Sequence, residues 1–174
     1  MDAADRNDAP PQLAQALDTP FDSRADAHSA MHGLVADQTA TQLLCFSADF
    51  SGWPLQQSSF VRQLELWALR DPRRPAALRM LALDWSTVRQ RFARFAAFRR
   101  DFAHVIECRQ ISETRARGLH EMIWTPNRAI YAHTATWMSG EQVRSATRLH
   151  AMHQVFEETW QQAITAFPAT TLGL

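Results

Sequence analysis

The chain has 174 residues, of which 46% are hydrophobic and 21% are charged, and its 18 basic and 18 acidic side chains leave no net charge at neutral pH. This length and balance are typical of one globular domain with a hydrophobic core. A neutral chain has no overall field that would draw it to nucleic acid or to an anionic membrane. All the basic residues are arginine, which excludes chemistry that needs a lysine amine, such as a Schiff base or a Walker A phosphate loop.

The N-terminal residues differ from the rest in composition. Residues 1–18 are rich in Asp, Ala, Pro and Gln and hold few side chains to bury, which predicts a disordered or loosely ordered arm. This start is acidic, whereas a secretory signal would be basic and then apolar, and no run of 18 apolar residues follows it. We therefore expect a single domain over residues 19–174, a cytoplasmic location and no membrane contact.

Helices and strands alternate through the first two thirds of the chain. A short extended piece at 19–23 precedes a helix over 24–38, which Ser23 or Asp22 can cap. Apolar runs of strand length occupy 41–50, 77–84 and 104–111, and apolar residues recur at helical spacing over 58–69 and 85–102. Cys45 and Cys108 lie inside two of the apolar runs without CxxC or Cys/His spacing, which predicts buried, reduced thiols.

The last third of the chain predicts a hairpin and a long helix. LHEMIW (119–124) and RAIYAH (128–133) read as two strands joined by a turn at 125–127, and a helix follows over 141–166. This element order predicts an α/β sandwich with a mixed, mostly parallel central sheet flanked by helices, whose last strands turn antiparallel.

The first strand of this hairpin carries the histidine of greatest interest. Strand alternation places His120, Met122 and Trp124 on one face, and Leu119, Glu121 and Ile123 on the other. This placement, late in an α/β chain and before a helix that contains Phe156 and Trp160, resembles one lobe of the phospholipase D superfamily over residues 19–167. The chain is also similar to an uncharacterised group of bacterial phospholipase D-like domains.

The signature of that superfamily is His-x-Lys-x4-Asp, on a strand and the turn after it. In this chain the histidine falls on His120, but the lysine position is Met122 and the aspartate position is Asn127. The small Gly/Ser-Asn segment that follows in the family would lie at 134–137, where this chain has TATW. The resemblance implies that the histidine attacks phosphorus, the lysine holds the phosphoryl oxygens and the acid orients the imidazole. Losing one preorganised donor costs about 10² to 10³ in rate, so two losses predict little remaining activity.

The sequence therefore predicts a catalytically degenerate phospholipase D-like domain that acts as a binding or interaction module. Its expected pocket, suited to a small or phosphate-bearing ligand, contains no metal or cofactor and is lined by His120, Met122, Trp124, Asn127, Arg128 and Tyr131. The resemblance also implies a homodimer, because family members with one signature per chain pair their motifs across a two-fold axis.

Two other functions stay open at the level of sequence. A divergent phosphodiesterase would keep His120 as nucleophile and recruit Arg128 or Glu121. A nucleic-acid-binding module would use the arginines and aromatics of RQRFARFAAFRR (89–100). The three-residue spacing of its phenylalanines and the zero net charge favour core packing with a solvated arginine face instead, so nucleic acid is not the expected partner.

Two histidine pairs and two tryptophans complete the candidate residues. His28 and His32, and likewise His150 and His153, have spacings that could present two ligands to a metal, but no third ligand accompanies either pair. We interpret both pairs as polar helix surfaces. Trp53 and Trp137 stand in loop-like contexts, where we expect them near a pocket or a partner surface.

Overall fold

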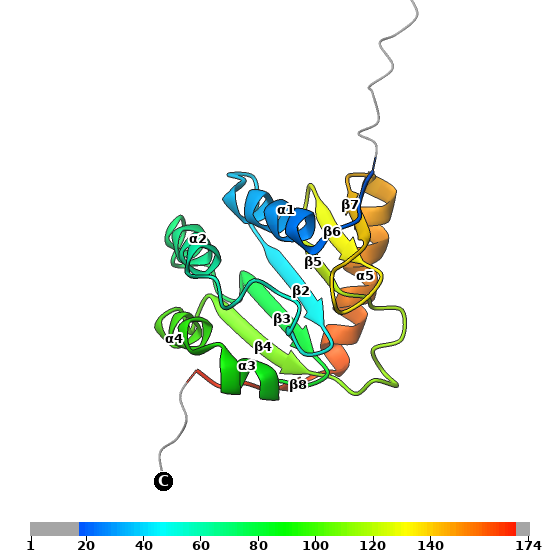
Figure 1. The fold of residues 1–174 in the computed structure, drawn as a ribbon. Coiled ribbons are helices and arrows are strands. Elements are labelled where there is room, and N and C mark those ends of the chain that lie inside the picture. The colour runs from blue at the N-terminus through cyan, green and yellow to red at the C-terminus, as the bar shows by residue number, and fades with distance from the viewer. Residues whose placement is uncertain (1–17, 170–174) are drawn as a thin grey trace, which may run out of the picture.

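One eight-stranded sheet runs through the computed structural model, which describes residues 18–169 (Figure 1). The strand order is β1-β7-β6-β5-β2-β3-β4-β8. In chain order the strands are β1 (Thr19–Phe21), β2 (Leu43–Ser47), β3 (Leu78–Ala82), β4 (Ile106–Gln110), β5 (Met122–Trp124), β6 (Ala129–Ala132), β7 (Gly140–Val143) and β8 (Ile164–Thr165). Apart from Asp18, the predicted N-terminal arm lies outside the described residues.

The sheet confirms the predicted α/β class and corrects the balance of strand directions. β2, β3 and β4 pair in parallel, as the strand–helix alternation predicts. All the other pairings are antiparallel, so the prediction of a mostly parallel sheet is wrong. A parallel pair needs a long crossover connection, whereas short turns add antiparallel strands. Short connections join β5, β6 and β7, which therefore pair in antiparallel fashion, while β1 and β8 add antiparallel strands at the two edges.

Helices cover both faces of the sheet, as Figure 1 shows. Four of them, α1 (Arg24–Ala36), α2 (Ser58–Leu69), α3 (Ser86–Arg91) and α4 (Ala93–Asp101), pack on one face, and α5 (Ala146–Gln162) packs on the other. The larger apolar cluster lies under the first four helices and includes Trp67 and Phe95, both fully buried. The smaller cluster lies under α5 and includes Phe156 and Trp160. Burying each such side chain contributes about 1.5–3 kcal/mol.

Several local predictions are confirmed. Ser23 caps α1, because its hydroxyl accepts a hydrogen bond from the Asp26 amide at 3.1 Å. Cys45 and Cys108 are buried and free, and burial raises the pKa of both thiols well above the ordinary value. In the described residues 18–169, no helix has both the length and the apolar character that a membrane crossing requires.

The predicted helix over 85–102 is two helices, with a break at Phe92, where ψ is 58°. No glycine or proline marks that position, so local sequence gives no signal for the break. Phe92, Phe95 and Phe98 are nevertheless all buried. Their three-residue spacing therefore marks a core-facing stripe, as predicted.

The last helix begins later than predicted. Residues 140–143 form β7, which pairs with β6 on one side and with β1 on the other. α5 then begins after Ser145, whose side chain accepts a hydrogen bond from the Arg148 amide. Asp18 reinforces this start by accepting hydrogen bonds from the amides of Arg144 and Ser145 at 2.7 and 3.1 Å. These partners come from 126 residues earlier in the chain, so a local pattern cannot reveal them.

Candidate functional site

The strand directions bring His120 and Glu121 to the edge of the sheet where the parallel strands end. β5 runs antiparallel to β2, with Met122 opposite Phe46, so the chain enters β5 beside the last residue of β2, Ser47. In open α/β sheets, ligands bind outside the carboxyl ends of the parallel strands. We call this end of the sheet the carboxyl edge.

The centre of the carboxyl edge is a buried carboxylate. Glu121 is 6% exposed and accepts four hydrogen bonds. One oxygen takes the Ser47 hydroxyl at 3.0 Å and the Ala48 amide at 2.7 Å. The other takes the indole N–H groups of Trp53 at 3.1 Å and Trp137 at 3.2 Å. Burial raises the pKa of Glu121, although the hydrogen bonds oppose that change.

Glu121 therefore fastens two loops over the sheet, one after β2 and one after β6. Trp53 and Trp137 meet edge to face, with their centroids 5.4 Å apart, and both are buried. The expectation that they lie near a pocket or partner surface is wrong, because their indole N–H groups point inward to a charge. The sequence does hold one signal for this network, because Glu121 lies between the apolar residues Leu119 and Ile123 on one face of the predicted strand.

The same two loops touch through their backbones at Gly52. A Cβ atom at Gly52 would lie 2.1 Å from the carbonyl oxygen of Ala135, so only glycine fits there. His28 supports the loop from α1, because its Nε2 lies 2.9 Å from the Gly52 carbonyl oxygen and its Nδ1 lies 3.3 Å from the Gln57 amide nitrogen. Burial lowers the pKa of His28. His28 is thus part of the loop packing and not a plain helix-surface residue.

His120 itself lies outside this network. Its imidazole is exposed and meets Tyr131 edge to face at 5.0 Å, and Tyr131 meets His133 in the same way at 5.3 Å. Met122, at the family's lysine position, is 2% exposed and belongs to the apolar cluster under α5. No cation replaces the missing lysine at that position.

The residues after β5 lie at the opposite end of the sheet. Thr125 and Arg128 close the turn through the hydrogen bonds of the Thr125 amide and hydroxyl to the Arg128 carbonyl oxygen, both 2.8 Å. Five residues separate His120 from Thr125, which corresponds to about 16 Å along a strand. Asn127 and Arg128 are therefore remote from His120.

The six predicted pocket residues consequently do not form one pocket. Trp124 and Asn127 border a cavity of about 440 Å³ beside α5, which also contains Arg144, His150 and His153. Arg128 borders a different cavity, of about 520 Å³, beside α1. These residues are separated because the chain from His120 to Arg128 runs from one end of the strands to the other.

The two histidines of the pair on α1, His28 and His32, pack against different parts of the structure. His32 lies against Phe60 of α2, edge to face at 5.0 Å, while His28 turns to the loop after β2. Within residues 18–169, no three or more His, Cys, Asp and Glu side chains are grouped so that they could hold a metal ion.

Comparisons with known proteins show which folds this chain is similar to. No family model matches the chain, and no curated protein matches it. Among solved structures, TrmBL2, an archaeal chromatin protein, is similar with a TM-score of 0.62 and 8% identity, over 90% of this chain and 57% of that one. Nuc from Salmonella typhimurium, a phospholipase D family member, is similar with a TM-score of 0.58 and 10% identity, over 86% of this chain and 97% of that one.

This chain spans little more than half the length of the archaeal protein, whose structure shows a novel mode of DNA binding. At such identities the likeness shows the fold alone. The chain has the phospholipase D-like α/β fold, as its element order predicts.

The buried carboxylate predicts a specific pH dependence of stability. Because the native pKa of Glu121 is raised above 4.5, the native state binds this proton more tightly than the unfolded chain does. The free energy of unfolding should then fall as pH rises from 4.5 through the native pKa. Glu121→Gln should remove this fall and, at neutral pH, lower the free energy of unfolding by about 1–3 kcal/mol, because an amide cannot accept four hydrogen bonds.

Urea unfolding of both proteins at several pH values measures the effect, with the exposed Glu158→Gln as the matched control. His28, whose lowered pKa works in the opposite direction below 6.5, is present in both proteins and cancels in the difference. The lowered pKa values of Asp18, Asp37 and Asp84 act below 3.8, outside this window. Parallel stability curves for the wild type and Glu121→Gln would contradict the assignment.

Proposed function

We propose that this protein is a catalytically degenerate phospholipase D-like domain, of the uncharacterised bacterial kind, that works by binding. The observation that carries the proposal is the surroundings of His120. The family's chemistry needs a cation on the same strand face, two residues after the histidine, and that position holds the buried apolar side chain of Met122. Without that cation, the charge that develops on a phosphoryl group in the transition state has no preorganised partner.

Neither Glu121 nor Arg128, the residues that a divergent phosphodiesterase would recruit, lies where it could act together with His120. The Glu121 carboxylate faces the opposite side of the strand and is saturated by four donors, so it cannot also serve His120. Arg128 lies beyond the far end of β5, at a separation of about 16 Å along the strand. A divergent phosphodiesterase that recruits either residue is therefore the weaker hypothesis.

The cavity beside α5 suits the binding of a small phosphate-bearing ligand. Its polar lining consists of Asn127, Arg144, His150 and His153, and no carboxylate borders it. Trp124 forms an aromatic wall, with His153 packed on it at 4.8 Å. Within the described residues, the Arg144 guanidinium takes part in no hydrogen bond or ion pair, which leaves its forked donors for an anion.

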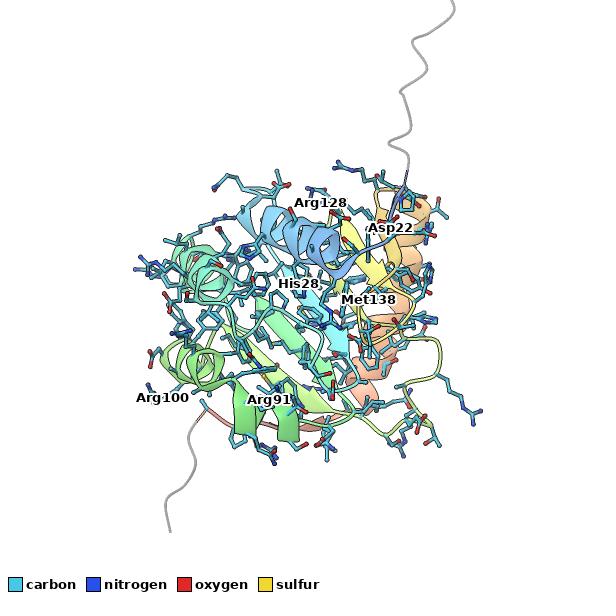
Figure 2. All side chains as sticks on the ribbon, viewed as in Figure 1. Asp22, His28, Arg91, Arg100, Arg128 and Met138 are labelled. Carbon is cyan, nitrogen blue, oxygen red and sulfur yellow. The ribbon has the colours of Figure 1, made fainter. Side chains whose placement is uncertain are left out.

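Nucleic-acid binding is the second candidate, and the arginines of α3 and α4 favour it. Arg89, Arg91, Arg94 and Arg100 are all exposed, and Figure 2 shows Arg100 at the margin of the molecule. Among them, only Arg100 has an ion pair in the described part of the chain, with Asp101. The structural similarity to a DNA-binding chromatin protein adds support. The zero net charge of the chain weighs against it.

The homodimer that the family resemblance implies stays a prediction. Met138, in the loop that follows His133, is 51% exposed and supplies an apolar group near the carboxyl edge that a second copy could cover.

Hydrolysis of a chromogenic phosphodiester by metal-free protein tests the proposed lack of turnover. We expect no release of nitrophenol above the buffer rate from the wild type or from His120→Ala. The matched control is His133→Ala, which alters the neighbouring exposed imidazole. Turnover that disappears only in His120→Ala would overturn the degenerate reading and establish His120 as a nucleophile.

Titration with inorganic phosphate, followed by ¹⁵N NMR, tests the cavity beside α5. We expect shifts at the backbone amides of Asn127 and His150, and a loss of affinity of about tenfold or more in Arg144→Gln, since a charge-assisted hydrogen bond contributes about 1.5–3 kcal/mol. Arg91→Gln removes an exposed arginine outside the cavity and should bind phosphate normally. Equal affinity in both variants would refute the site.

Salt dependence distinguishes the nucleic-acid candidate. Four arginine–phosphate contacts predict that the logarithm of the affinity for a short DNA duplex falls with the logarithm of salt concentration at a slope of about −3 to −4. A triple change of Arg89, Arg91 and Arg94 to Gln should reduce that slope to about −1, while Arg62→Gln on α2 should leave it unchanged. A flat salt dependence in the wild type would eliminate this candidate.

A further inference from the structure

Arg128 occupies an unusual place in the cavity beside α1. Its side chain is half-buried, and its Nη2 lies 3.9 Å from the position of a Cβ atom on Gly33, so the guanidinium lies against the helix. Its Nε is fully buried and has no hydrogen-bond partner among residues 18–169. In this part of the chain no carboxylate forms an ion pair with it either. Burial and the nearby Arg144 lower the pKa of Arg128, and the Asp37 carboxylate opposes this change without forming an ion pair with it.

A partly buried cation without a partner costs stability, so its retention calls for an explanation. The other arginines with buried Nε atoms have partners: Arg79 pairs with Glu157, Arg99 donates to the Ala103 carbonyl oxygen and Arg74 pairs with Asp71. Arg128 alone of this set, within the described residues, instead borders a cavity of about 520 Å³. The guanidinium therefore has room for an external anion.

The opposite end of the same cavity is acidic. Asp22 and Asp26, at the start of α1, line it together with Arg128, and the lining between them includes Pro20 and Ala30. Figure 2 shows Asp22 and Arg128 on the same side of the molecule, beside α1. Asp26 already accepts the Ser23 hydroxyl, whereas Asp22 is exposed. The cavity thus has a cationic end, an apolar middle and an anionic end.

Helix geometry sets the separation of the two ends. Asp26 and Gly33, the residue nearest the Arg128 guanidinium, are seven residues apart, which is about 10 Å along the helix axis. A hydrogen-bonded ion pair takes up about 2.8 Å at each end, so about 5 Å remains for the ligand. This length exceeds the spacing of the charges in an α-amino acid and corresponds to an aliphatic chain of a few carbons.

We propose that this cavity binds a small linear zwitterion, whose carboxylate pairs with Arg128 and whose ammonium group pairs with Asp22 and Asp26, with its aliphatic middle on Pro20 and Ala30. The inference goes beyond the proposed function, because this cavity lies on the α1 face of the sheet, away from His120 and from the cavity beside α5. It holds whether or not the domain hydrolyses phosphodiesters or binds phosphate.

The test uses 4-aminobutanoate, whose extended length matches this span, and two fragments of matched length, butanoate and butylamine, with the full chain. The side-chain Nε–Hε signal of Arg128 in a ¹⁵N spectrum is the direct readout, assigned by its absence in Arg128→Gln. We expect the zwitterion to shift this signal and the backbone amide of Gly33 at millimolar concentration. Each single-charge fragment should bind at least about tenfold more weakly, since one ion pair is lost.

Single substitutions distinguish binding in this cavity from a general effect of the protein's charge on binding. Arg128→Gln and Asp22→Asn should each weaken the binding of 4-aminobutanoate about tenfold or more. Asp22 is exposed, so its replacement leaves the fold intact even if Arg128→Gln does not fold. Arg144→Gln, which removes a neighbouring arginine that does not line this cavity, should bind normally. No shift of the Arg128 signal, binding unaffected by Asp22→Asn, or butanoate binding as tight as the zwitterion would each overturn the proposal.

Discussion

The Glu121 carboxylate holds together the end of the sheet where a phospholipase D-like site would lie. Four donors from three separate segments converge on it: the end of β2, the loop that follows β2, and the loop that follows β6. A buried carboxylate is stable only when its oxygens accept hydrogen bonds. The need for these hydrogen bonds to Glu121 therefore fixes the position of all three segments. The contact of Gly52 with Ala135 and the packing of Trp53 on Trp137 follow from that convergence.

The surroundings of His120 are set by the packing of the residues that follow it. Glu121 points toward the two loops that it bonds, whereas Met122 and Trp124 of β5 pack under α5. The side chains on both faces of the chain are therefore buried immediately after His120. Trp137, in the segment where the family has small residues that follow its signature, extends its indole N–H to Glu121. The positions that correspond to the signature's lysine and to its small segment are thus occupied by buried, packed side chains.

The sequence predicts most of the fold because its signals are local. Apolar runs, the three-residue spacing of phenylalanines and the Ser23 cap all act within one element, and they appear as expected. The predictions fail where the existence or the bounds of an element depend on residues far away in the chain. β7 exists because β1 and β6 flank it, and the start of α5 depends on Asp18, far away in the chain. The excess of antiparallel pairings has the same origin, since strand direction after β4 is set by pairing rather than by composition.

The candidate site shows the same limit more sharply. Motif spacing correctly places Met122 on a strand and Asn127 in the turn after it, whereas His120, which the predicted strand of 119–124 includes, lies just before β5. Spacing alone does not show that the chain from His120 to Arg128 runs from one end of the strands to the other, or that Arg128 lies beside α1 while Trp124 faces α5. A set of residues that is contiguous in sequence thus serves three environments: an exposed histidine at the carboxyl edge, a donor-lined cavity beside α5 and a charge-polarised cavity beside α1. The last two do not depend on the residues of the superfamily signature's histidine and lysine positions, and each includes a residue of the turn that follows β5.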